Sequence, residues 1–196
     1  MVSVISALGA LVKYFQSSGN EYLLRLKGVD VRRQLQRQLP WQGSAVAERD
    51  LTLDNARVRL DEGSDEVIVG LALALAPAAS VASGSGDCAN LAVTGVLEFS
   101  AGVDYCAREG AFYLCAVDLH HCEIPKLPAS EASTVRAAVL AEVEALCASA
   151  SIHTLAGMGQ HSDGSGAGVS DSARAFRTLR LSDVAVVNRC LILALD

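Results

Sequence analysis

The chain has 196 residues, of which 51% are hydrophobic and only 19% are charged, so it is long enough to bury a sizeable core as one domain. Its formal net charge of −6 argues against nucleic acid as the main partner. Its six cysteines lack the spacing of a disulfide framework, and we therefore expect reduced thiols and a reducing compartment.

The chain begins with an apolar extension, residues 1–20, which precedes a single domain spanning residues 21–196. The stretch "MVSVISALGALVKYF" is too short to cross a bilayer, and no acidic residue occurs before Glu21. Two interpretations stay open for it. It is either an organelle-targeting or membrane-surface segment, or a helix packed on the body of the protein.

The segment "YLLRLKGVDVRRQLQRQLPW" predicts a strand followed by a short amphipathic helix. The apolar stripe of this helix consists of Val31, Leu35 and Leu39. One interpretation is a solvated helix that caps the sheet. The other is a cationic surface that contacts anionic lipid headgroups or an acidic partner subunit. The residues assigned to that surface are Arg32, Arg33, Arg37 and Trp41.

Four long strands follow, each marked by side chains that alternate with period two. "LTLDNARVRL" shifts its alternation near Asn55, which indicates a β-bulge, and "EVIVGLALALAP" places bulky residues on one face and small ones on the other. "LAVTGVLEFSAGVDY" and "AFYLCAVDLHHCEI" form a hairpin with Gly110 at a positive-φ position of the turn. In the second hairpin strand we expect Phe112 and Leu114 on the outer face, opposite Tyr113.

A long helix is predicted from Ser130 by "SEASTVRAAVLAEVEALCAS". Its apolar stripe has spacings of three and four residues and comprises Val135, Val139, Val143, Leu146 and Ala150. After a Gly/Ser-rich loop, "FRTLRLSDVAVVNRCLILALD" predicts a strand pair that turns near Asn188. The order of elements is strand, helix, four long strands, long helix and two strands, which is an α+β chain.

This order, together with the turns, resembles the YceB-like bacterial lipoprotein family, a domain of unknown function. The pieces that carry the resemblance are the segment from Tyr22 to Trp41, the four-strand meander, the helix from Ser130, and the closing "LSDVAVVNRCLILAL". The resemblance implies a TULIP-like tubular lipid-binding fold: a long, strongly curved antiparallel β-sheet wrapped around a long α-helix, with a short N-terminal helix. It also implies a bacterial envelope location, whereas the chain lacks the family's lipoprotein signal.

No motif in the sequence predicts catalysis, a metal or a cofactor, and we expect a protein that is not an enzyme. In "LHHCEIP" we expect His120 and Cys122 on one strand face with His121 pointing away, which supplies too few ligands for structural zinc. Asp118 and His120 could form a hydrolase triad with a serine, but the sequence contains no G-x-S-x-G nucleophile elbow.

The function expected from this shape is non-enzymatic binding of a lipid or another elongated apolar ligand in a cavity between the curved sheet and the helix. The expected ligand-lining residues are Val69, Leu71, Leu73, Val93, Leu97, Phe99, Tyr113, Val117, Val139 and Val143. The competing interpretation is that these side chains pack against one another as a solid hydrophobic core and leave no cavity.

The alternative function is that of a structural accessory subunit in a larger membrane-associated complex. It rests on strands that are apolar on both faces, because an outer sheet face normally alternates with polar residues. Gly70, Ala72 and Ala74 lie on the face opposite the leucines of their strand. In the last strand, leucines occupy one face, and Cys190 and Ile192 occupy the other. A protein partner would then cover the outer face, with peripheral membrane contact, in a mitochondrion or another reducing, membrane-adjacent compartment.

Overall fold

A computed structural model describes residues 22–44, 49–77, 92–125, 127, 129–155 and 178–196 of the chain. The apolar extension expected at residues 1–20 lies outside these described residues. The described elements, in chain order, are β1 (Tyr22–Lys27), α2 (Gly28–Gln36), β2 (Trp41–Gln42), β3 (Arg49–Arg59), β4 (Val67–Pro77), β5 (Val93–Cys106), β6 (Ala111–Glu123), α3 (Ala129–Ser149), β7 (Ser151–Thr154), β8 (Leu181–Val187) and β9 (Cys190–Leu195).

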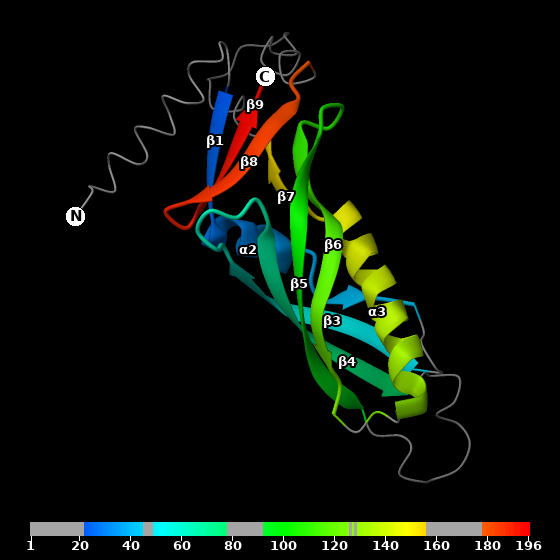
Figure 1. Ribbon diagram of the computed structural model, residues 1–196. Helices are drawn as coiled ribbons and strands as arrows, with labels where there is room; N and C mark the ends of the chain where they lie inside the picture. Colours follow the sequence, from blue (N-terminus) through cyan, green and yellow to red (C-terminus); the bar gives the residue numbers. More distant parts are fainter. Residues whose placement is uncertain (1–21, 45–48, 78–91, 126, 128, 156–177) are drawn as a thin grey trace, which may run out of the picture.

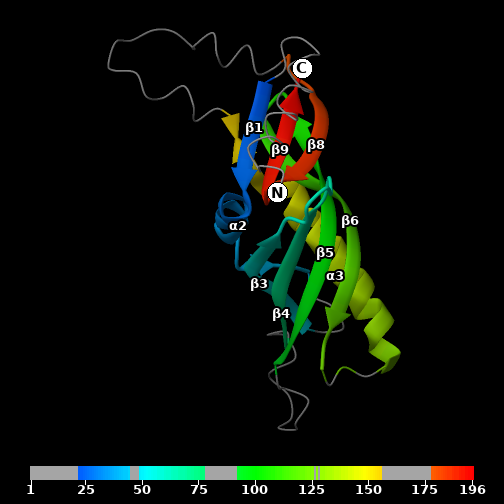
Figure 2. The same cartoon turned by 60° about the vertical axis from the view of Figure 1, so that its left-hand side comes forward.

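The strands form two antiparallel sheets instead of the single sheet expected from the sequence. Strands β2 to β7 make a six-stranded sheet in chain order, and this sheet is strongly curled into a half-barrel (Figure 1). Strands β1, β9 and β8 make a separate three-stranded sheet, in which the first described strand pairs with the last. Figure 2 shows this small sheet standing at one end of the large one.

The expected turns and bulges are confirmed. The β3–β4 register shifts between Asp54 and Arg57, and Asn55 takes a positive φ of 55° there. Gly110 in the β5–β6 turn has a φ of 62°, a conformation that glycine adopts without steric cost. Asn188 and Arg189 form the tight turn between β8 and β9.

The helix α3 has 21 residues and lies alongside β6, with β3 and β4 passing behind it in Figure 1. Its predicted apolar stripe is confirmed, because the side chains from Val135 to Ala150 that make it up are at most 2% exposed. Arg136 Nη2 donates a hydrogen bond to the carbonyl of Leu119 at 3.0 Å, which fixes the N-terminal half of α3 to β6.

The short helix α2 lies at the junction of the two sheets and contacts β1, β3 and β7 (Figures 1 and 2). It buries Val31 and Leu35, with Leu39 half-buried, while Arg32, Arg33 and Arg37 remain exposed. The predicted amphipathic pattern of this helix is therefore confirmed. None of the described helices is both long enough and apolar enough to span a membrane.

One prediction about face is wrong. Phe112 and Leu114 belong to the core, at 0% and 2% exposed, whereas Tyr113 is only half-buried. The cause is a β-bulge, since the β5–β6 register shifts between Ser100 and Gly102 and Ala116 takes a positive φ of 48° opposite this point. A bulge adds one residue to one strand and thereby reverses which side chains face inward beyond it.

Candidate functional site

The space between the curled sheet and α3 is filled by the protein's own side chains along most of its length. Of the expected ligand-lining residues, seven are no more than 3% exposed and belong to the packed core: Val69, Leu71, Leu73, Leu97, Phe99, Val139 and Val143. Val93 is half-buried. These residues face inward as expected, and they fill one another's space as a core does.

A cavity of about 450 Å³ opens where the C-terminal half of α3 leaves β6. We call this cavity the seam pocket. It is lined by Asp104, Cys106, Glu109, Tyr113, Leu114, Cys115, Ala116, Val117, Glu144, Cys147 and Ala148. The pocket includes two of the ligand-lining residues expected from the sequence, Tyr113 and Val117.

The seam pocket has an apolar interior and a polar rim. Leu114 and Cys147 are core residues, at 2% and 1% exposed, and Val117 packs against the core. By contrast, Asp104, Glu109 and Glu144 are exposed. An apolar wall bounded by a few polar groups is the usual design of a small-molecule site.

Two thiols of the pocket, those of Cys115 and Cys147, are poor nucleophiles. Burial raises the pKa of Cys147 to about 12, and burial followed by the charge of Asp104 raises the pKa of Cys115. The reacting species of cysteine is the thiolate, so a raised pKa keeps these two groups protonated and inert at neutral pH. Neither of these two thiols is therefore an activated nucleophile.

The rim is ordered by a small hydrogen-bond network at the β5–β6 turn. The hydroxyl of Tyr113 donates to Glu109 Oε2 at 2.5 Å, and Arg108 Nη2 donates to Glu109 Oε1 at 3.0 Å. The bond to Glu109, together with burial, raises the pKa of Tyr113 to about 12. Tyr113 is therefore held with its ring at the pocket and its hydroxyl protonated.

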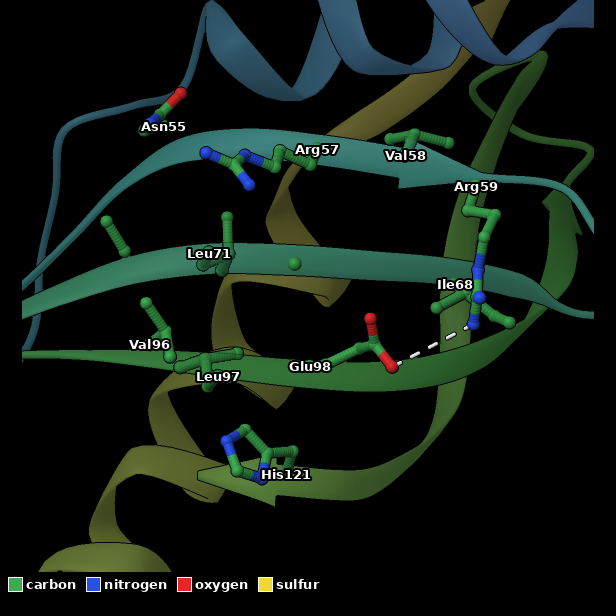
Figure 3. A pocket seen from close by; sticks show the side chains of 12 residues that line it. Asn55, Arg57, Val58, Arg59, Ile68, Leu71, Val96, Leu97, Glu98 and His121 are labelled. Atoms are coloured by element: carbon green, nitrogen blue, oxygen red, sulfur yellow. Dashed lines mark ion pairs between the residues drawn. The ribbon is translucent and has the colours of Figure 1, made fainter. Parts of the chain in front are cut away.

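A second depression, of about 490 Å³, lies on the outer face of the six-stranded sheet (Figure 3). Its floor includes the small residues Gly70 and Ala72 of β4. Figure 3 shows Arg57 and Arg59 on the β3 side of this floor and Glu98 and His121 on the other. The expected lining residues Leu71 and Leu97 also border this outer groove.

The outer groove is a weaker candidate than the seam pocket. Arg59 is 60% exposed and is shared between Asp61, at 3.5 Å, and Glu98, at 3.9 Å. Charges that stay in water and neutralise one another contribute little to binding a further ligand. The groove therefore lacks the desolvated polar groups that give a site its affinity.

The exposed face of α2 gathers arginines around an apolar side chain. A shallow depression there is lined by Val29, Arg32, Arg33, Gln36 and Arg37, which we call the cationic face. Val29 is 54% exposed. Arg33 forms an ion pair with Asp30 at 3.2 Å, and Arg37 donates a hydrogen bond to Gln34 at 2.9 Å.

Trp41, which the sequence associates with these arginines, does not line the cationic face. Its indole Nε1 donates to Glu142 Oε2 on α3 at 3.1 Å. The backbone N–H of Ser44 donates to Glu142 Oε1 at 2.8 Å. The tryptophan thus fastens β2 to α3, and Val29 supplies the apolar group of the cationic face.

The side chains of "LHHCEIP" lie in different environments. No group of three histidine, cysteine, aspartate or glutamate side chains that could hold a metal occurs among the described residues. Cys122 packs against the core, whereas both histidines are exposed and pair with Asp118 and Glu123. The expectation that His120 and Cys122 share a face is wrong, because the register shifts again between Glu98 and Phe99.

Sequence reasoning missed nine of the eleven residues that line the seam pocket, among them Leu114, Glu144, Cys147 and Ala148. For Cys147 a signal was present, since it follows Val143 of the apolar stripe by four residues and thus shares its helix face. For Leu114 none was present, because its direction depends on the bulge at Ala116. No family model matches the chain, and no curated protein is significantly similar to it.

Proposed function

We propose that the protein binds an elongated apolar ligand at the seam pocket and does not transform it. The observation that carries the proposal is the pocket between α3 and β6, whose lining includes the core residues Leu114 and Cys147. An alkyl chain bound in this pocket would pack against these core residues and so extend the hydrophobic core toward the surface. In this proposal the curled sheet and α3 are the counterparts of a TULIP-like fold, as the YceB-like resemblance implies.

The free energy available to such a ligand comes from burial of its methylene groups. Each buried methylene contributes about 0.8 kcal/mol, so about ten of them contribute ~8 kcal/mol before ordering costs. Because the rest of the interior is packed, the chain end would lie at the seam and would not extend along the whole helix.

The proposal is tested by a substitution that places a bulky side chain at the rim of the pocket. Ala148 lies on α3, is exposed and lines the pocket, whereas Ala145 is exposed on the same helix and does not line it. We expect Ala148→Trp to weaken binding of a fluorescent acyl-chain probe at least tenfold, because the indole occupies the volume of the alkyl chain. Ala145→Trp should bind the probe as the unaltered protein does.

Two results would contradict the proposal. One is an unaltered protein, purified gently, that neither carries lipid in native mass spectrometry nor binds the probe. The other is equal probe affinity for the two tryptophan variants, which would place the probe elsewhere.

A second candidate function is peripheral attachment to a membrane as an accessory subunit of a larger complex. The observation in its favour is the cationic face, where Val29 is one of the two large hydrophobic side chains that are exposed within the described part of the chain. An apolar side chain surrounded by arginine stems suits the boundary between headgroups and acyl chains.

A further inference from the structure

The charged residues that line the seam pocket all have the same sign. Asp104 comes from β5, Glu109 from the β5–β6 turn and Glu144 from α3, and no lysine, arginine or histidine is among the lining residues. Glu109 is neutralised by Arg108, whose Nη2 lies 3.0 Å from its carboxylate. Within the described chain, Asp104 and Glu144 form no ion pair.

The two unpaired carboxylates stand on opposite sides of the pocket. The charge of Asp104 contributes to the raised pKa of Cys115 on the sheet side, and that of Glu144 contributes to the raised pKa of Cys147 on the helix side. Both thiols belong to the pocket wall, so both carboxylates act on its interior. Cys147 is 1% exposed, so its thiol lies at the buried end of the pocket.

Besides the two carboxylates, the rim contains the aromatic ring of Tyr113. Tyr113 lines the pocket, and its hydroxyl is occupied by Glu109. The face of a tyrosine ring attracts cations, most usefully alkylammonium groups that are weakly hydrated. An ammonium group at this rim would thus meet a tyrosine ring and two carboxylates, while a carboxylate or phosphate monoester would meet like charges.

We propose that the seam pocket selects an amphiphile with an alkyl chain and an ammonium head, the chain against Leu114 and Cys147 and the head between Asp104, Glu144 and Tyr113. This inference rests on the proposed function, because it assumes an apolar ligand in the same pocket. Two kinds of amphiphile carry such an ammonium group: a simple alkylamine, and a single-chain lipid with a phosphocholine head.

The experiment compares three amphiphiles that have the same decyl chain and differ in the head: decyltrimethylammonium, decylphosphocholine and decanoate. Each is titrated into the full chain by calorimetry, below its micelle concentration. We expect the ammonium compound to bind at least tenfold more tightly than decanoate at low salt. We also expect this preference to shrink as salt is added, because the rim carboxylates are exposed and screened. Binding of decylphosphocholine close to that of the ammonium compound would identify a phosphocholine lipid, and weaker binding would identify a simple amine.

Charge reversal on α3 supplies the matched variants. Glu144→Lys should lower affinity for the ammonium compound and raise affinity for decanoate. Glu131→Lys, which makes the same charge change at the opposite end of α3, should leave both affinities unchanged. Circular dichroism verifies that each variant retains its fold.

The possible failures are distinguishable. If none of the three amphiphiles binds, the proposed function itself is wrong. If all three bind equally and Glu144→Lys changes nothing, the pocket binds alkyl chains without selecting the head, and only the present inference is overturned. Tighter binding of decanoate to the unaltered protein would overturn it as well.

Discussion

At the scale of single residues, Glu142 connects α3 to the segment that contains β2. Its carboxylate accepts the indole N–H of Trp41 and the backbone N–H of Ser44. Its side chain also lies where Gly43 leaves room, since a Cβ at Gly43 would come within 2.9 Å of it. One carboxylate on α3 therefore holds the β2 segment against the helix.

The first prediction concerns the charge of this residue. The backbone hydrogen bond from Ser44, followed by the bond from Trp41, lowers the pKa of Glu142 below its ordinary value. We expect Glu142→Gln to reduce the free energy of unfolding at pH 7 by about 1 kcal/mol, after discounting for solvent screening of a partly exposed group. The free energy of unfolding is measured by urea titration, with fluorescence of the single tryptophan as the readout.

The pH dependence of this difference follows from the sign of the shift. A carboxylate with a lowered folded-state pKa stabilises the fold above its unfolded pKa, about 4.3 for glutamate, and the contribution is lost as the pH falls through the folded value. The gap between the unaltered protein and Glu142→Gln should therefore close as the solution is acidified below about pH 4. Glu144→Gln, an exposed position on the same helix, should leave stability unchanged. A gap that persists in acid would show that packing, and not charge, is responsible.

At the scale of secondary-structure elements, Gly95 determines how the chain leaves the sheet and enters α3. Gly95 lies on β5 opposite Leu73, and a Cβ there would overlap the carbonyl oxygen of Glu123 and lie 3.2 Å from the Cα of Ile124. The backbone after β6 thus crosses the inner face of β5 in close contact with this glycine. Ile124 then packs against the core, and α3 begins on the inner face of the sheet.

The second prediction tests this crossing. We expect Gly95→Ala to destabilise the protein by about 2–3 kcal/mol, because the overlap is with backbone, which cannot rotate away. Gly70→Ala on β4 is the control, since its Cβ would meet the nearest atoms at 3.7 Å, an ordinary contact. That variant should lose no stability, and thermal unfolding of the two variants and the unaltered protein measures the difference. Similar losses for both glycines would contradict the proposed crossing.

The elements also show how far the sequence predicts this molecule. The apolar stripe of α3, the amphipathic α2 and the bulge at Asn55 were all predicted, because each leaves a local pattern in a periodic element. The inward side of β6 was not, because its bulges near Ala116 and His120 occur at residues that carry no glycine or proline signal. The seam pocket depends on those bulges, so its full composition could not be predicted.

At the scale of the whole molecule, the two sheets are joined where the turn between β3 and β4 meets β8, which is distant in sequence. The N–H of Gly63, after β3, donates to the carbonyl of Val186 at 3.0 Å, and the N–H of Val186 donates to Ser64 at 2.7 Å. The sequence predicted the seven longer strands but not the short strands β2 and β7. It did not predict this division into two sheets either, because alternation within a strand does not specify its partner. The six residues of β9 are all buried, as expected for a strand that is apolar on both faces.

The charge of the molecule is distributed unevenly over this fold. The net charge is −6, the rim of the seam pocket is acidic, and the arginines of the cationic face lie together on α2. A protein with one basic face orients that face toward an anionic surface even when its net charge is negative, because the field near the surface acts over about 10 Å at moderate salt. Arg32 and Arg37 are better suited to this contact than Arg33, which is paired with Asp30.

The last prediction is that Arg32→Glu/Arg37→Glu weakens binding to vesicles of phosphatidylserine and phosphatidylcholine at least tenfold. The reason is that each basic residue near an anionic surface contributes about 1 kcal/mol, and a tenfold change in affinity corresponds to about 1.4 kcal/mol. Arg57→Glu/Arg59→Glu makes the same change in net charge on β3, and co-sedimentation with that variant should match the unaltered protein. An equal loss for the two double variants would mean that only net charge matters, and the cationic face would then have no part in membrane attachment.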